Sequence, residues 1–176
     1  MMNEKRLIRD LKKGKEEAYS ELINLYGNKL LKATYLIIKD EKHAEDIVQE
    51  TFIRVFKYIK NFKGDSSIYT WIYRISHNVT MDFLKSSTPT IVYEDYHEES
   101  SDNIEDTTIL NMEIDDMRMA LDSLNYIYKQ VLVLFYFEDL SIREICQILD
   151  EKEGTIKSRL SRGRLELKKF LVEEEV

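Results

Sequence analysis

Residues 140–171 read LSIREICQILDEKEGTIKSRLSRGRLELKKFL, and this stretch predicts two helices in the C-terminal part of the chain. Ser141 followed by Glu144 has the pattern of a capping box, which predicts the start of a short helix. The apolar residues of that helix recur at helical spacing: Ile142, Ile145 and Leu149. Residues 150–153 interrupt this period. A second, longer helix is then predicted from a stripe spaced by three and four: Ile156, Leu160, Gly163, Leu167 and Phe170.

The face of the second helix opposite this stripe is polar and basic. At about 100° per residue it carries Ser158, Ser161, Arg162, Leu165 and Lys169, flanked by Lys157 and Lys168. Two helices joined by a short turn, with such a face near the start of the second, are typical of a helix-turn-helix that enters the major groove of DNA. Arg and Lys neutralise phosphates and donate to guanine, while Ser and Thr permit close approach. An ordinary helical hairpin with a basic exterior is the alternative.

The composition of the whole chain favours helices. Its 176 residues include five Gly and one Pro, with 43% hydrophobic and 34% charged residues, which leaves few turn residues for a sheet. The longest apolar run, residues 131–137, is far shorter than the roughly 20 residues that cross a bilayer, so we expect no membrane insertion. The single cysteine, Cys146, excludes an internal disulfide framework, and we expect a cytoplasmic protein.

The net charge of −7 is distributed unevenly along the chain. Residues 1–85 hold 16 Lys or Arg and 12 Asp or Glu, residues 86–117 hold none and 10, and residues 118–176 hold 10 and 11. The middle segment also contains the only Pro, which predicts an acidic, flexible linker. We therefore predict an all-α fold in which a domain of residues 1–86 and a domain of residues 112–176 are joined by a linker of residues 87–111.

Residues 43–62, HAEDIVQETFIRVFKYIKNF, predict a further amphipathic helix. Its buried stripe is Ala44, Ile47, Val48, Thr51, Val55, Ile59 and Phe62, and its outward face carries Asp46, Gln49, Glu50, Ile53 and Lys57. An apolar Ile53 among carboxylates indicates a docking surface for a protein. A catalytic pair or a metal site at Asp46 and Glu50 is the alternative, but an open helix face lacks the pocket that shifts carboxyl pKa values.

Residues 62–85, FKGDSSIYTWIYRISHNVTMDFLK, predict a turn and a third helix. The turn is formed by Lys63, Gly64, Asp65, Ser66 and Ser67. The helix is predicted to bury Ile68, Ile72, Ile75, Val79 and Phe83, and to expose Trp71, Arg74, Asn78 and Lys85 on one flank and Tyr69 and Tyr73 on the other. Aromatic rings mixed with cations are typical of surfaces that bind single-stranded nucleic acid, and a polar turn beside them can receive a flipped base.

Three stretches together resemble bacterial sigma factors of the extracytoplasmic-function group, which belong to the sigma-70 family of RNA polymerase specificity subunits. They are AEDIVQETFIRVF at 44–56, FKGDSSIYTWIYRISHN at 62–78, and LSIREICQIL with EGTIKSRLSRGR within 140–164. The resemblance covers nearly the whole chain. It implies a subunit that directs promoter-specific transcription initiation, without a catalytic site, a metal or a cofactor of its own.

The resemblance also implies roles for particular residues and partners. Docking onto the clamp helices of the largest subunit of core RNA polymerase would involve Asp46, Gln49, Glu50 and Ile53. A flipped base of the minus-ten element of promoter DNA would be held by Lys63, Gly64, Asp65, Ser66, Ser67, Trp71, Tyr73, Arg74 and Asn78. The minus-thirty-five element would be read by Lys157, Ser158, Ser161 and Arg162, with Thr155 and Arg159 near phosphates. An anti-sigma factor is a further implied partner.

Two functions of other classes compete with this interpretation. A stand-alone repressor or activator would use the same helix-turn-helix, but such regulators usually bind as dimers, and the sequence shows no dimerisation heptad. A metal-dependent enzyme would need clustered ligands, and the three histidines, His43, His77 and His97, lack ligand spacing. The repressor hypothesis also leaves residues 62–78 without a role.

Overall fold

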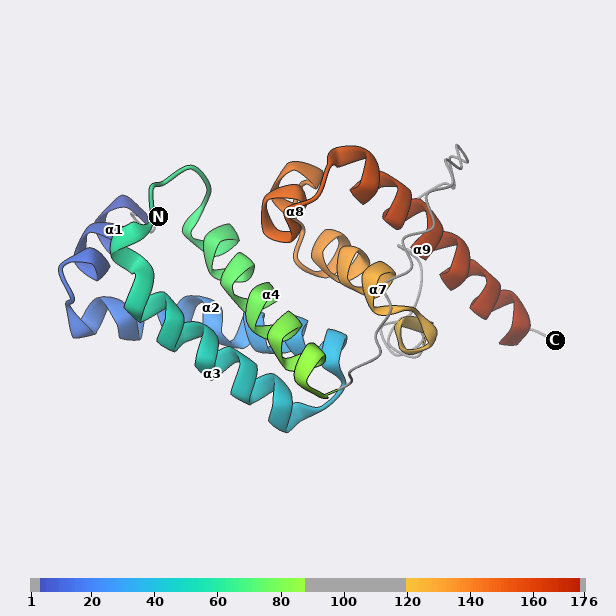
Figure 1. Cartoon of the computed structure of the whole chain (residues 1–176), viewed down its shortest axis with the longest axis horizontal. Helices are drawn as coiled ribbons and strands as arrows, with labels where there is room; N and C mark the ends of the chain where they lie inside the picture. The colour runs from blue at the N-terminus through green and yellow to red at the C-terminus, as the bar shows by residue number, and fades with distance from the viewer. Residues whose placement is uncertain (1–3, 88–119, 175–176) are drawn as a thin grey trace. The chain divides into compact units, whose positions relative to one another are not determined.

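The computed structural model describes residues 4–87 and 120–174. All regular secondary structure within these two ranges is helical (Figure 1). The prediction of an all-α fold is therefore confirmed. Contacts divide the chain into two compact units, Met1–Ile91 and, for the most part, Val92–Val176, which we describe separately. The predicted linker lies outside the described residues from position 88 onward. Within the described ranges no helix is long and apolar enough to cross a membrane.

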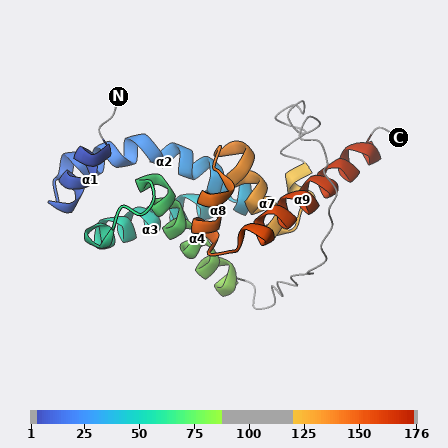
Figure 2. The same ribbon diagram turned by 90° about the horizontal axis from the view of Figure 1, so that it is seen from above.

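The N-terminal unit is built from four α-helices and one short 3-10 helix. They are α1 (Glu4–Lys12), α2 (Glu16–Ile38), α3 (Glu41–Tyr58), η1 (Ile59–Asn61) and α4 (Ile68–Ser87). Helix α3 packs against both α2 and α4 (Figures 1 and 2). The core between them is aliphatic and includes Leu22, Leu30, Val55, Ile59, Ile68 and Ile72. Burial of this apolar surface is the main stabilising contribution to the unit.

The connection between α2 and α3 uses two residues with complementary local roles. Lys39 adopts a left-handed conformation (φ 63°) that ends α2, and its N–H donates to the carbonyl of Tyr35 at 2.8 Å. The side chain of Asp40 then accepts the N–H of His43 at 2.8 Å and caps the start of α3. This short connection holds α2 and α3 as antiparallel neighbours.

Helix α1 is fastened to the loop that joins η1 to α4. The carboxylate of Glu4 accepts the N–H of Ile68 at 2.7 Å, at the first residue of α4. The ammonium group of Lys12 donates to the carbonyl of Phe62 at 2.6 Å, at the other end of the same loop. Both ends of the loop are thus bonded to side chains of α1, which are more than 45 residues away in the sequence.

The C-terminal unit contains α7 (Tyr126–Leu132), the π-helix η2 (Val133–Phe137), α8 (Ile142–Leu149) and α9 (Glu153–Glu174). Residues 120–123 are also helical. Helix α7 packs against α9 (Figure 1), and Gly163 on α9 lies where the two helices meet. The predicted stripe on α9 is confirmed for Ile156, Leu160, Gly163 and Leu167, which are all buried. The side chain of Phe170 lies outside the described residues.

Candidate functional site

The loop between Phe62 and Ile68 is shaped by one glycine and one helix cap. Gly64 has a φ of 85°, a left-handed conformation that a residue with a Cβ adopts only with strain. The hydroxyl of Ser67 accepts the N–H of Thr70 at 3.0 Å and so caps the start of α4. Lys63, Gly64 and Asp65 remain exposed at the tip of the loop. The predicted turn is confirmed, and Ser67 serves as its cap.

Helix α4 presents fewer aromatic rings than the sequence predicted. Trp71 is half-buried against Phe62, with 5.3 Å between the ring centroids, while Arg74 and Asn78 are exposed. The predicted exposure of Tyr69 and Tyr73 is wrong, because their side chains are only 8% and 3% exposed. The ring of Tyr69 packs on that of Tyr26 in α2, at 5.1 Å, and on that of Tyr73 at 5.8 Å. The ring of Tyr73 therefore offers no exposed face for stacking on DNA.

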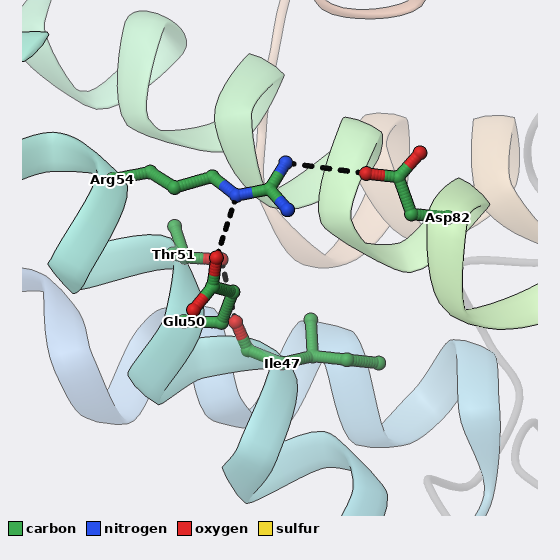
Figure 3. A network of polar contacts seen from close by, with 5 residues as sticks. All are labelled: Ile47, Glu50, Thr51, Arg54 and Asp82. Carbon is green, nitrogen blue, oxygen red and sulfur yellow. Dashed lines mark hydrogen bonds and ion pairs between the residues drawn. The ribbon is translucent and has the colours of Figure 1, made fainter.

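The outward face of α3 exposes most of the residues predicted to dock a partner. Asp46 and Gln49 are exposed, and the apolar side chain of Ile53 is 54% exposed. Glu50 is only half-exposed, because its carboxylate accepts the Nε–H of Arg54 at 2.8 Å. Arg54 also donates to Asp82 on α4 at 3.2 Å (Figure 3), and the hydrogen bond to Glu50 raises the pKa of its guanidinium.

An apolar groove between α2 and α3 extends this face beyond the sequence prediction. The groove has a volume of about 680 Å³, and its lining includes Gln49 and Ile53 from the predicted face. It also includes three residues that the prediction omitted: Tyr19, Ile23 and Phe56. Ile23 and Phe56 are 48% and 61% exposed, so each is a large apolar residue off the buried stripe of its helix. The sequence signal that could have revealed the groove is a large apolar residue outside the buried stripe. The prediction overlooked it because the helical spacing was used only to assign the buried face.

The helix-turn-helix forms as predicted in its local details. The Ser141 hydroxyl accepts the N–H of Glu144, and the Glu144 carboxylate accepts the N–H of Ser141 at 2.9 Å, which completes the capping box. Asp150 ends α8 in a left-handed conformation with φ 57°. Asp tolerates such a conformation better than most residues. Helix α9 then begins at Glu153.

The basic residues of α9 differ in how far they are available to a ligand. Lys157 is exposed and pairs with Glu153 at 2.6 Å, which lowers the pKa of that carboxyl. Thr155, Ser158, Ser161 and Arg162 are half-exposed. Arg159 differs from the prediction that placed it near phosphates, because its side chain is only 11% exposed and donates to Glu151 at 2.9 Å. We therefore assign Arg159 to holding the turn between α8 and α9.

A further basic residue of α9, Arg164, is held by contacts within the C-terminal unit. The Nε–H of Arg164 donates to the hydroxyl of Tyr136 at 2.8 Å, and its guanidinium lies 5.8 Å from the centroid of the Phe135 ring. This contact joins α9 to η2.

Comparison with known protein families decides between the candidate functions. The family pattern described as Sigma-70 region 2 matches residues 22–90, and the pattern described as Sigma-70, region 4 matches residues 114–167. The ECF RNA polymerase sigma factor SigW of Bacillus subtilis (strain 168) is 31% identical over 183 residues, which cover 97% of each chain. The chain belongs to the sigma-70 family. Within that family it is a member of the extracytoplasmic-function group.

One further relative is similar to this sigma-70 family member in sequence, and one solved structure is similar to it in fold. The RNA polymerase sigma-H factor of Pseudomonas aeruginosa is 28% identical over 180 residues, which cover 96% of this chain and 93% of the relative. The fold is similar to that of the sigma factor RpoE of Bartonella quintana, solved in complex with the anti-sigma factor NepR. That match has a TM-score of 0.68 and 22% identity, and it covers 87% of this chain and 96% of the other.

Proposed function

We propose that this sigma-70 family member binds core RNA polymerase and directs promoter-specific transcription initiation. The observation that carries the proposal is the presence of region 2 and region 4 in one chain, in the order and along the length of the B. subtilis relative. A stand-alone regulator with a helix-turn-helix would not contain region 2. In this role the chain is a specificity subunit of RNA polymerase that has no catalytic site. It acts in the cytoplasm, where core polymerase binds DNA.

The N-terminal unit, which we assign to residues 1–86, recognises the melted minus-ten element. The exposed tip at Lys63, Gly64 and Asp65 receives a flipped non-template base, with Ser66 and the Ser67 cap beneath it. The half-buried Trp71 offers a ring face, since it is already fixed by Phe62 and loses little freedom on stacking. Arg74 and Asn78 follow on the same flank of α4 and donate to phosphates or base edges.

The C-terminal unit, which we assign to residues 112–176, reads the minus-thirty-five element as duplex DNA. Helix α9 enters the major groove through its first three turns, with Lys157, Ser158, Ser161 and Arg162 toward the base edges and Thr155 toward the backbone. Arg159 supports this surface by holding Glu151 in the preceding turn. The acidic linker of residues 87–111 joins the two reading units.

Core polymerase docks on α3, where the clamp helices of its largest subunit contact Asp46, Gln49, Glu50 and Ile53. The groove between α2 and α3 adds apolar area to this contact through Ile23 and Phe56. The same exposed surfaces are available to an anti-sigma factor. The solved complex of the B. quintana sigma factor with NepR supports such a partner for this chain.

Run-off transcription with bacterial core polymerase, on fragmented genomic DNA from the source organism, tests the proposal. New discrete start sites are expected when the chain is added. We expect Asn78→Ala to weaken start sites that depend on the minus-ten element, and Arg162→Ala to weaken those that depend on the minus-thirty-five element. An absence of both new transcripts and core binding overturns the proposal and favours the repressor hypothesis.

The docking surface is tested separately by capture of core polymerase. Phe56→Ser, in the groove, is expected to weaken core binding about tenfold, the effect of losing roughly 1.4 kcal/mol of buried apolar contact. Tyr35→Ser is the matched control, because Tyr35 is 46% exposed on α2 and does not line the groove. Equal binding by the two variants would show that the groove is not part of the interface.

A further inference from the structure

The positive charge of the N-terminal unit is concentrated on one helix. Residues 4–15 contain six Lys or Arg and two acids, whereas residues 16–85 contain ten of each. The net charge of +4 on residues 1–85 therefore resides entirely in α1 and the turn after it. The roles implied for this chain in docking and promoter reading do not use these cations.

The structure brings this charge beside the loop that reads the minus-ten element. Helix α1 is bonded to both ends of the loop, through Glu4 to the N–H of Ile68 and through Lys12 to the carbonyl of Phe62. The Lys12 ammonium also lies 6.0 Å from the centroid of the Phe62 ring. These contacts lie within the N-terminal unit, so the placement of α1 against the loop is fixed by the unit itself.

A groove of about 450 Å³ lies between α1 and the start of the loop. Its lining contains five cations and no carboxylate: Lys5, Arg9, Lys12, Lys13 and Lys63. The nearby acid on α1, Asp10, is engaged by Lys15 at 3.1 Å and by Arg9 at 3.5 Å. In the part of the chain that the structure describes, Lys5, Lys13 and Lys63 have no ion-pair partner. Such clustered cations repel one another unless a polyanion binds there.

We propose that this basic groove binds the phosphate backbone of single-stranded DNA that continues from the minus-ten loop. The proposal rests on the proposed function, because that function places a melted strand at Lys63 and Gly64, the residues where the groove ends. A chain of phosphates leaving the loop in this direction meets Lys13, Arg9 and Lys5 along α1. Contacts of this kind add affinity without sequence preference and weaken steeply with salt.

Binding of a 5′-fluorescein-labelled dT20 oligonucleotide to the free full-length chain, followed by fluorescence anisotropy at 20 to 200 mM salt, tests the groove. We expect Lys5→Ser/Lys13→Ser to weaken binding about tenfold or more at 20 mM salt. The slope of log Kobs against log salt should fall in magnitude by about 1.4, since each single-strand phosphate contact contributes about 0.7. The conservative pair Lys5→Arg/Lys13→Arg should retain binding.

The matched control is Lys32→Ser/Lys42→Ser, which removes two exposed lysines from α2 and α3 of the same unit. It changes the net charge equally and should leave the slope unaltered. Equal losses in the two pairs would overturn the proposal, because net charge alone would then explain them. Unchanged dT20 binding in the Lys5/Lys13 pair would overturn it as well. The assay contains no polymerase, so a failure of the groove is distinguishable from a failure of the sigma function, which run-off transcription reports.

Discussion

Gly163 leaves no room for a side chain between α9 and α7. A Cβ at this position would lie 2.9 Å from Cδ1 and 3.2 Å from Cγ of Leu132, and 3.3 Å from Cβ of Tyr128. We expect Gly163→Ala to lower the free energy of unfolding by about 1 to 2 kcal/mol, since overpacking outweighs the gain in helix propensity of about 1 kcal/mol. Urea denaturation followed by circular dichroism measures the change.

Gly154 provides the matched control for this prediction on the same helix. A Cβ built there meets no atom within 4 Å, so Gly154→Ala should leave stability unchanged or raise it by up to about 1 kcal/mol. A Gly163→Ala variant as stable as the parent would show that α7 shifts without cost and that the contact is loose.

Cys146 is predicted to react slowly in the folded chain. Burial raises the pKa of its thiol, and the nearby charge of Glu153 adds to this effect. Because the thiolate is the nucleophile, the folded chain holds a smaller reactive fraction at every pH than the unfolded chain does. Iodoacetamide labelling at pH 8 should therefore be slower in buffer than in 6 M urea. Equal rates would contradict the shielding of this thiol.

At single positions, the sequence predicted what depends on near neighbours. The capping box at Ser141 and Glu144 is set within a few residues, and this prediction is confirmed. The predicted exposure of Tyr69 and Tyr73 was wrong. Helical spacing within α4 does not show that Tyr69 packs on Tyr26 of α2 and that Tyr73 packs on Tyr69. The ion pair between Arg159 and Glu151 was not predicted, because it depends on the conformation of the turn between α8 and α9.

At the scale of elements, the attachment of α1 to α4 is a contact that no local pattern reveals. Glu4 accepts the N–H of Ile68 across 64 positions of sequence. Removing it in Glu4→Ala leaves that buried N–H unpaired, which should cost about 1 to 2 kcal/mol of unfolding free energy. Hydrogen exchange of the Ile68 amide and of α1 should accelerate, and both are measurable by NMR.

Glu4→Gln separates the hydrogen bond from the charge. The amide oxygen still accepts from Ile68, so this variant should lose less than half as much stability as Glu4→Ala. If both variants protect the Ile68 amide as well as the parent does, another group caps α4. In that case Lys12 alone would fasten α1 to the loop before α4, through its hydrogen bond to the carbonyl of Phe62.

Arg54 couples α3 to α4 through two carboxylates on different helices (Figure 3). Its side chain is 33% exposed and that of Asp82 is 62% exposed, so solvent screens the pair. A double-mutant cycle of Arg54→Met and Asp82→Asn should give a coupling free energy of only about 0.2 to 1 kcal/mol. A larger value would mean that this pair holds the two helices together, in place of the apolar core around Val55 and Ile72.

At the scale of the whole molecule, the sequence predicted the helical class and the family better than it predicted the grooves of the surface. Segmental charge and three separate motifs were enough for the family, because each motif is local. The groove at Ile23 and Phe56 and the basic groove beside α1 arise where two elements meet. The sequence of one element alone does not show where it will form a groove with a second element.

The uneven charge also predicts how the free chain behaves toward duplex DNA. Seven acids lie between residues 94 and 106, within a chain of net charge −7, so replacing them by amides brings the net charge to about zero. Repulsion of phosphates would then fall while the basic surface of α9 is unchanged. We expect nonspecific binding of a 30-bp duplex to tighten at 50 mM salt, and the gain to vanish near 300 mM because salt screens it. Electrophoretic mobility shifts measure both values. Unchanged affinity at low salt would mean that the acidic segment does not oppose the binding of the free chain to DNA.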